Sequence, residues 1–289
     1  MMNNTIKGIL PINKPQGWTS FDVVNKIKHL INQRGFKIGH LGTLDPMATG
    51  VLLVTLGKAT KLFDLMQQKT KTYMAEFVFG YETDTLDITG TKTNQKDNID
   101  INLKQIKAIL PEFLGQISQI PPKYSAKSIN GKRAYDLARD NKDFELKPCS
   151  VYIKDLQIID FKNNVLTLKI VCGSGTYIRA LGRDIAAKLG SLATMQSLVR
   201  TDIDNFNLQN CFEIDDINAD NLQSKVVKID KILNLPCIEF GNLETAKILN
   251  GLTVKTMQND GLYILNDKID TIALVEVKGF NAKMSIYLA

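Results

Sequence analysis

Runs of apolar residues divide the chain into short strands. Residues 51–56 are continuously apolar, which predicts a strand that is buried on both faces. The segment Lys71–Phe79 alternates instead, with aromatic and small side chains on one side, and therefore predicts a strand with one buried face. Residues 8–12 and Val165–Cys172 also have the apolar character of strands.

Two longer helices are expected between these strands. The first covers Ser20–Ile31, and either Thr19 or Ser20 can cap it. The second follows the glycine-containing segment 173–176, where a serine or threonine can open the helix, and runs to about residue 189. Residues 91–102 are polar and predict a surface loop.

The pattern changes toward the C-terminus. Residues 212–235 predict one or two helices with an acidic stretch. A short helix is then expected over 244–249, followed by several short strands with polar turns. This change predicts a small β-rich appendage.

Composition and charge narrow the class of protein. With 289 residues and 44% hydrophobic side chains, the chain suits a soluble protein with one large domain or two unequal ones. Its net charge of +6 and isoelectric point near 9.0 favour an anionic partner, nucleic acid first, although many unrelated enzymes share this balance.

The cysteines and histidines indicate neither a metal site nor disulfides. The four cysteines are widely spaced, and there are only two histidines, whereas a zinc site needs clustered ligands. Scattered reduced thiols suit a cytosolic protein. The N-terminal residues are too polar for a signal peptide, and no apolar run could cross a bilayer, so we expect a cytoplasmic location.

The segment 39–50 carries the first candidate for catalysis. It contains glycines at both ends and one carboxylate, Asp45, which Pro46 biases toward an extended or turn backbone. One interpretation is an ordinary turn between a helix and a strand, since Asp-Pro commonly begins a turn. The other is a loop that presents a catalytic acid to a bound ligand.

A basic segment, residues 121–139, is a candidate for nucleic-acid contact. Bases stack on aromatic rings while lysine and arginine neutralise phosphates, so its composition fits a contact with single-stranded or loop RNA. A solvated loop and helix would have the same composition. The residues concerned are Lys123, Lys127, Lys132, Arg133 and Arg139, with Tyr124 and Tyr135 between them.

One arginine and one pair of aspartates are further candidates for binding an ion. Arg179 falls in the first turn of the second predicted helix, where it could receive a phosphate or a carboxylate of the protein itself. Asp84 and Asp87 suggest a site for a hard metal ion, but two carboxylates without a third ligand more often cap loops.

Five ordered motifs give the chain a resemblance to a known family. They are Asn13-Lys14-Pro15-Gln16-Gly17, residues 39–50, Lys71-Thr72-Tyr73 with Gly80 and Thr83-Asp84-Thr85, residues 122–139, and Gly175-Thr176-Tyr177-Ile178-Arg179. Over nearly its whole length the chain resembles the TruB family, the tRNA pseudouridine-55 synthases. The resemblance implies a mixed α/β (α+β) fold around a mixed β-sheet, and the isomerisation of uridine to pseudouridine in the T arm of tRNA.

The resemblance also implies the catalytic residues. Asp45 matches the catalytic aspartate, Tyr73 matches the tyrosine that stacks on the target base, and Arg179 matches the arginine that pairs with the aspartate. An opposite charge nearby lowers the pKa of a carboxyl group by roughly 1–3 units, so Arg179 would keep Asp45 ionised. Whether Asp45 acts as a nucleophile or as a base at the sugar is left open.

Other positions are implied as contacts to the RNA. His40 matches the histidine that helps to hold the flipped nucleotide out of the tRNA loop, and Leu198 resembles the apolar wall of the pocket. Lys14 and Tyr177 are implied supports of that pocket. Lys123, Lys127, Lys132 and Arg133 would clamp the backbone of the arm.

The implied organisation is a catalytic domain over residues 1–236, with the basic insertion at about 120–147, and an RNA-binding module of the PUA type over 237–289. No cofactor and no metal are implied, and tRNA is the expected partner of a monomer without an obligatory protein partner. The chain departs from the family pattern at Asp204-Asn205, where a glycine is usual, and its tail matches PUA modules only loosely.

Three alternatives remain at this stage. A guide-RNA-dependent pseudouridine synthase of the dyskerin type shares these motifs. A tRNA-folding chaperone would bind and remodel the arm without depending on chemistry. A metal-dependent enzyme would use Asp84 and Asp87.

Overall fold

The computed structural model describes residues 6–97, 100–125, 127–129, 131–140, 144–267 and 270–289. The chain divides into two compact units. The first unit contains residues 1–45, 52–67 and 210–289, and the second contains residues 46–51 and 68–209. No helix in the described ranges has the length and apolar character that a membrane span requires.

A mixed β-sheet forms the centre of the second unit. Its antiparallel strands lie side by side in the order β12 (Ala193–Ile203), β4 (Lys71–Phe79), β11 (Val165–Cys172), β10 (Cys149–Lys162) and β7 (Gly115–Gln119). The first residues of β3 (Thr49–Leu56) pair in parallel with β12. At this pairing Gly50 lies against the backbone of Arg200, where a Cβ atom would overlap the carbonyl oxygen.

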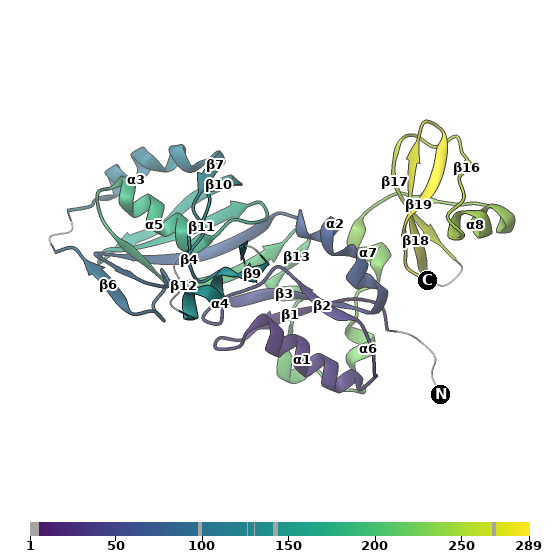
Figure 1. Cartoon of the computed structure of the whole chain (residues 1–289), viewed down its shortest axis with the longest axis horizontal. Helices are drawn as coiled ribbons and strands as arrows, with labels where there is room; N and C mark the ends of the chain where they lie inside the picture. Colours follow the sequence, from purple (N-terminus) through teal and green to yellow (C-terminus); the bar gives the residue numbers. More distant parts are fainter. Residues whose placement is uncertain (1–5, 98–99, 126, 130, 141–143, 268–269) are drawn as a thin grey trace. The chain divides into compact units, whose positions relative to one another are not determined.

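Helix α5 (Ile178–Lys188) packs on this sheet against β4 and β12 (Figure 1). Alternate residues of β4 are buried, as the sequence pattern predicts. Gly182 of α5 lies so close to the ring of Phe77 that a Cβ atom at position 182 would overlap it. This close approach fixes the first turn of α5, which carries Arg179, relative to β4.

Shorter elements surround the sheet of the second unit. They are β5 (Tyr81–Thr83), β6 (Lys92–Gln95), α3 (Leu103–Ile109), η2 (Leu110–Phe113), β8 (Ser128–Ile129), β9 (Lys132–Arg133), α4 (Ala134–Arg139), β13 (Phe206–Asn207) and η3 (Leu208–Asn210). The pair β5–β6 and the pair β8–β9 are antiparallel hairpins.

In the first unit, helix α1 (Ser20–Ile31) packs against strands β1 (Gly8–Lys14) and β3. Strand β14 (Phe212–Glu213) lies beside β1, which lies beside β3, and β2 (Ile38–Leu41) pairs with β3. Apolar residues of α1, β1 and β3 form one buried cluster. The unit also contains η1 (Gly57–Leu62), α2 (Phe63–Gln67), η4 (Ile214–Asp216), α6 (Leu222–Lys225) and α7 (Ile229–Leu233).

Residues 237–289 form a separate five-stranded sheet with its own hydrophobic cluster. Its strands follow the order β15 (Cys237–Ile238), β17 (Gly261–Asn266), β18 (Thr271–Lys278), β19 (Asn281–Tyr287) and β16 (Val254–Lys255), and α8 (Asn242–Leu249) packs beside it. The predicted β-rich tail is therefore confirmed.

Several local expectations differ from the structure. Residues 39–41 belong to strand β2 instead of a loop, and residues 92–95 form β6. Helix α5 begins after Tyr177 without a side-chain cap, because the hydroxyl of Thr176 donates to the carbonyl of Gly173 instead (3.1 Å). Asp204 adopts a positive φ of 52° in the β12–β13 turn, a conformation that aspartate tolerates, so the turn forms without the glycine usual in the family.

Candidate catalytic site

Asp45 lies in the loop that follows β2 of the first unit. The residue is half-buried, between a buried Leu44 and an exposed Pro46. The hydroxyl of Ser20, at the start of α1, accepts a hydrogen bond from the N–H of Leu44 (2.9 Å) and donates to its carbonyl (3.3 Å). The loop that presents the carboxylate is therefore held to the helix.

Lys14 and His40 are the other predicted site residues of this unit. Lys14 ends β1 and is fully buried, and its Nζ donates to the carbonyls of Pro15 (2.9 Å) and Trp18 (2.6 Å). Lys14 thereby braces the turn between β1 and α1. His40 is half-buried on β2, where its cross-strand partner is Val54. Their roles toward RNA stay predictions.

Tyr73 and Leu198 lie on neighbouring strands of the second unit. Tyr73 on β4 pairs with Arg200 on β12, and Leu198 pairs with Ala75. All four side chains are buried, and cross-strand partners project from the same face of a sheet. The guanidinium carbon of Arg200 lies 6.0 Å from the centre of the Tyr73 ring, and Arg200 Nε donates to the carbonyl of Val51 (2.7 Å). The phenol ring is thus held beside a buried cation.

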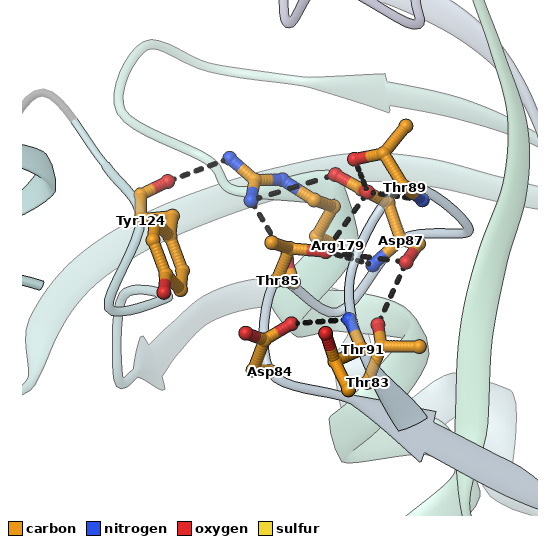
Figure 2. Close-up of polar contacts among 8 residues, drawn as sticks. All are labelled: Thr83, Asp84, Thr85, Asp87, Thr89, Thr91, Tyr124 and Arg179. Carbon is orange, nitrogen blue, oxygen red and sulfur yellow. Dashed lines mark hydrogen bonds and ion pairs between the residues drawn. The ribbon is translucent and has the colours of Figure 1, made fainter. Parts of the chain in front are cut away.

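Arg179 is buried in the first turn of α5, where its guanidinium joins two loops (Figure 2). One terminal nitrogen, Nη1, donates to the carbonyl of Thr85 (2.8 Å), and the other, Nη2, donates to the carbonyl of Tyr124 (2.9 Å). Nη1 also lies 3.7 Å from Oδ2 of Asp87. Of the two kinds of anion expected at this helix, the structure shows a carboxylate of the protein itself.

Asp87 organises the loop that receives Arg179 (Figure 2). Its Oδ1 accepts hydrogen bonds from the hydroxyl of Thr85 (2.9 Å) and from the N–H and hydroxyl of Thr89 (3.0 and 2.5 Å). Thr83 donates to the Asp87 carbonyl (2.7 Å). Because Oδ1 is occupied by the loop, Oδ2 faces the guanidinium, so Asp87 both shapes the loop and neutralises Arg179.

Neither Asp84 nor Asp87 belongs to a metal-binding cluster in the part of the chain that the structure describes. Asp84 accepts the N–H of Thr91 (2.8 Å), as expected of a carboxylate that caps a loop. The sequence interpretation of both as loop caps is confirmed for these contacts. It missed the second role of Asp87 beside Arg179, for which the only sequence signal was its position just after Thr83-Asp84-Thr85.

Gln119 holds Tyr177, the residue two positions before Arg179. Gln119 ends strand β7 and is fully buried. Its Oε1 accepts the N–H of Tyr177 (2.8 Å), and its Nε2 donates to the carbonyl of Tyr177 (3.1 Å). Gln119 thus fixes the backbone of Tyr177 at the point where α5 begins. No sequence motif pointed to Gln119.

The basic segment forms the β8–β9 hairpin and helix α4. The side chains of Lys123, Lys127 and Lys132 are exposed, and the side chain of Arg133 lies outside the described part of the structure. The rings of Tyr124 and Tyr135 meet edge to face with centres 6.0 Å apart. Since the carbonyl of Tyr124 accepts from Arg179, the start of the basic segment is joined directly to α5.

Lys71 is a second buried cation near Tyr73, at the start of β4. Its Nζ donates to the carbonyl of Lys69 (2.7 Å), and its cross-strand partner on β11 is Cys172. Burial, with a contribution from the charge of Arg200, lowers the pKa of Lys71 to about 8. Burial likewise raises the pKa of the Cys172 thiol to about 11.

The chain is similar to known proteins in both sequence and structure. Residues 28–178 match the model of the TruB family pseudouridylate synthase N-terminal domain. A tRNA pseudouridine synthase B of Dehalococcoides mccartyi is 39% identical over 86% of this chain and 84% of its own length. The enzyme of the same name from Mycoplasma mobile is 38% identical over 94% of this chain and 91% of its own.

A solved structure shares the fold at lower sequence identity. One chain in the crystal structure of a Cbf5–Nop10–Gar1 complex matches with a TM-score of 0.71 and 22% identity, over 97% of this chain and 84% of that chain. At this identity the likeness concerns the fold alone.

We predict that Gln119→Met destabilises the protein. Methionine keeps the length of the side chain but leaves both backbone groups of Tyr177 without their buried partner, which should lower the free energy of unfolding by about 2–4 kcal/mol. Urea unfolding measures this change. Gln116→Met, at an exposed position of the same strand, is the matched control. Equal stability of the two variants would contradict the clamp.

We also predict that Lys71 makes stability depend on alkaline pH. Between its folded pKa of about 8 and its ordinary value of 10.5, the unfolded state binds more protons at this group, so the free energy of unfolding rises with pH. Relative to Lys71→Met, the free energy of unfolding of the wild type should rise by about 3 kcal/mol between these two pH values. Urea unfolding of both proteins at several pH values tests this prediction. If the free energies of unfolding of the two proteins changed in parallel with pH, the lowered pKa of Lys71 would be refuted.

Proposed function

The chain belongs to the TruB family of pseudouridylate synthases and is an isomerase that acts on tRNA, and we propose that its target is the uridine at position 55 in the T arm. The observation that carries this proposal is the buried guanidinium of Arg179, held by Thr85, Asp87 and Tyr124. It stands at the motif position of the arginine that the family pairs with its catalytic aspartate. The motif that contains Asp45 is also intact.

The reaction needs bond exchange at one carbon atom of the ribose. The bond from C1′ to N1 of uracil breaks, the base turns, and a bond from C1′ to C5 forms. The hydrogen on C5 leaves as a proton, and N1 gains a proton, so the product is an isomer of the substrate. No electron is transferred to or from an external group, and the chemistry therefore requires no redox cofactor.

We assign the central role to the carboxylate of Asp45, as a nucleophile or a base at the sugar. The family resemblance supports Arg179 as its partner, which would favour the ionised carboxylate. Tyr73 would stack on the flipped base, and Leu198, which lies on the same face of the sheet, would supply an apolar wall. The Arg200 cation lies near the Tyr73 ring, and a cation is attracted to the electron-rich face of an aromatic ring.

The uridine must leave its stack before it can react. Extruding a base costs a few kcal/mol, which contacts to the flipped nucleotide and to the phosphates must offset. We propose that His40 helps to hold the nucleotide out and that Lys14 supports the loop that precedes α1. Lys123, Lys127 and Lys132 are exposed and available to phosphates, and Arg133 would extend this basic segment.

The remaining assignments concern organisation. We infer a catalytic domain over residues 1–236 and a PUA-like RNA-binding module over 237–289, which the separate sheet and hydrophobic cluster of the C-terminal residues support. We also infer that the protein acts in the cytoplasm as a monomer without an obligatory protein partner. The bacterial relatives named as tRNA pseudouridine synthase B support a tRNA enzyme of this kind.

We predict that the purified protein releases tritium from a tRNA transcript labelled at C5 of uridine. Asp45→Asn should abolish release while tRNA binding is retained, because the amide is neither a nucleophile nor a base but keeps the shape of the side chain. A transcript in which the T-arm uridine is replaced by cytidine should release no tritium.

Each failure has a different meaning. Release from the substituted transcript at the wild-type level would refute the T-arm site. Full activity of Asp45→Asn would refute the role of the carboxylate. Activity only after addition of a guide RNA would replace the stand-alone enzyme by a guide-dependent one.

A further inference from the structure

Ser20 holds the peptide that leads into Asp45. The hydroxyl is 2.9 Å from the Leu44 nitrogen, from which it accepts, and 3.3 Å from the Leu44 carbonyl oxygen, to which it donates. That carbonyl belongs to the peptide unit between Leu44 and Asp45, so the hydrogen bond fixes the plane from which the Asp45 backbone begins. Ser20 and Leu44 are 1% and 2% exposed, so water does not compete effectively for these bonds.

These bonds are separate from the capping of helix α1. The N-cap is Thr19, whose hydroxyl accepts the N–H of Asp22 (3.0 Å), while Asp22 accepts the N–H of Thr19 in return (2.8 Å). Ser20 is the first residue of the helix, and its side chain points away from the cap toward the loop. The helix end is satisfied without Ser20, which leaves its hydroxyl to serve the loop.

The loop around Asp45 is thereby restrained from both sides. Before Asp45, Ser20 bonds both backbone groups of Leu44. After Asp45, the ring of Pro46 restricts the backbone of the preceding residue to extended or turn conformations. The backbone that carries the Asp45 carboxylate therefore has few alternative conformations, which favours the fixed placement that a reacting group requires.

We propose that Ser20 is a positioning residue for Asp45, an inference that rests on the proposed function. It acts through the Leu44 peptide and does not touch the substrate. Its loss should therefore slow the chemical step without weakening the binding of tRNA. A residue that only stabilises the fold would have no such selective effect.

The test compares Ser20→Ala with Thr19→Ala at the same helix end. Thr19→Ala removes the cap but no bond to Leu44, so it controls for a general loss of stability at the same helix end. Ser20→Ala should lower kcat roughly 10- to 100-fold with KM for tRNA unchanged, because small displacements of a reacting group have effects of this size. Ser20→Cys, which keeps a weak donor and acceptor, should be intermediate. Thr19→Ala should keep the wild-type kcat.

A second measurement does not depend on activity. Amide hydrogen exchange of Leu44, followed by NMR, should become faster in Ser20→Ala and stay unchanged in Thr19→Ala. Equal kcat losses in the two variants, an effect of Ser20→Ala on KM alone, or unaltered exchange at Leu44 would each overturn the proposal. A wild type that forms no pseudouridine would refute the proposed function instead, and an active wild type with a fully active Ser20→Ala variant would refute only the role of Ser20.

Discussion

A guanidinium buried away from water must find hydrogen-bond acceptors and a compensating charge, because a buried cation without them is strongly destabilising. Arg179 meets this requirement with two carbonyls, from Thr85 and Tyr124, and with the carboxylate of Asp87. The second unit is arranged accordingly. The loop after β5 is folded around Asp87, and the start of the basic segment is held at Tyr124. The side chain of Arg179, itself a predicted catalytic residue, thus links the basic segment to helix α5.

Two other buried side chains work in a related way. Gln119 bonds both backbone groups of Tyr177, close to Arg179, and Ser20 bonds both backbone groups of Leu44, next to Asp45. In each case a side chain replaces the regular pairing of a helix or sheet at a place where the chain is irregular. Irregular backbone is needed to present a reactive group, and satisfying its polar groups keeps it in one conformation.

The sequence predicted what depends on local pattern. The alternation along Lys71–Phe79 and the apolar run Val165–Cys172 gave the correct strands, and helical spacing gave the helix Ser20–Ile31. The resemblance to a family pointed to Asp45, Tyr73 and Arg179. The partners that hold these residues were not predictable, because they are distant along the chain: Ser20 and Leu44 are 24 residues apart, Gln119 and Tyr177 are 58 apart, and Arg179 and Thr85 are 94 apart. A glutamine or serine has no periodic pattern that indicates which distant backbone group it will bond.

We expect isomerisation to require the fixed guanidinium of Arg179, and the variant Arg179→Lys removes that guanidinium while keeping a cation. Lysine keeps the positive charge but cannot reach two carbonyls with one planar fork. Arg183→Lys is the control on the same helix, at a position that bonds Asp184 and the carbonyl of Ile120. The measurement is the single-turnover rate of pseudouridine formation, with tRNA affinity determined in parallel. We predict that Arg179→Lys loses roughly 100-fold or more in rate with its tRNA affinity retained, and that Arg183→Lys has a nearly normal rate. A normal rate in Arg179→Lys would contradict it.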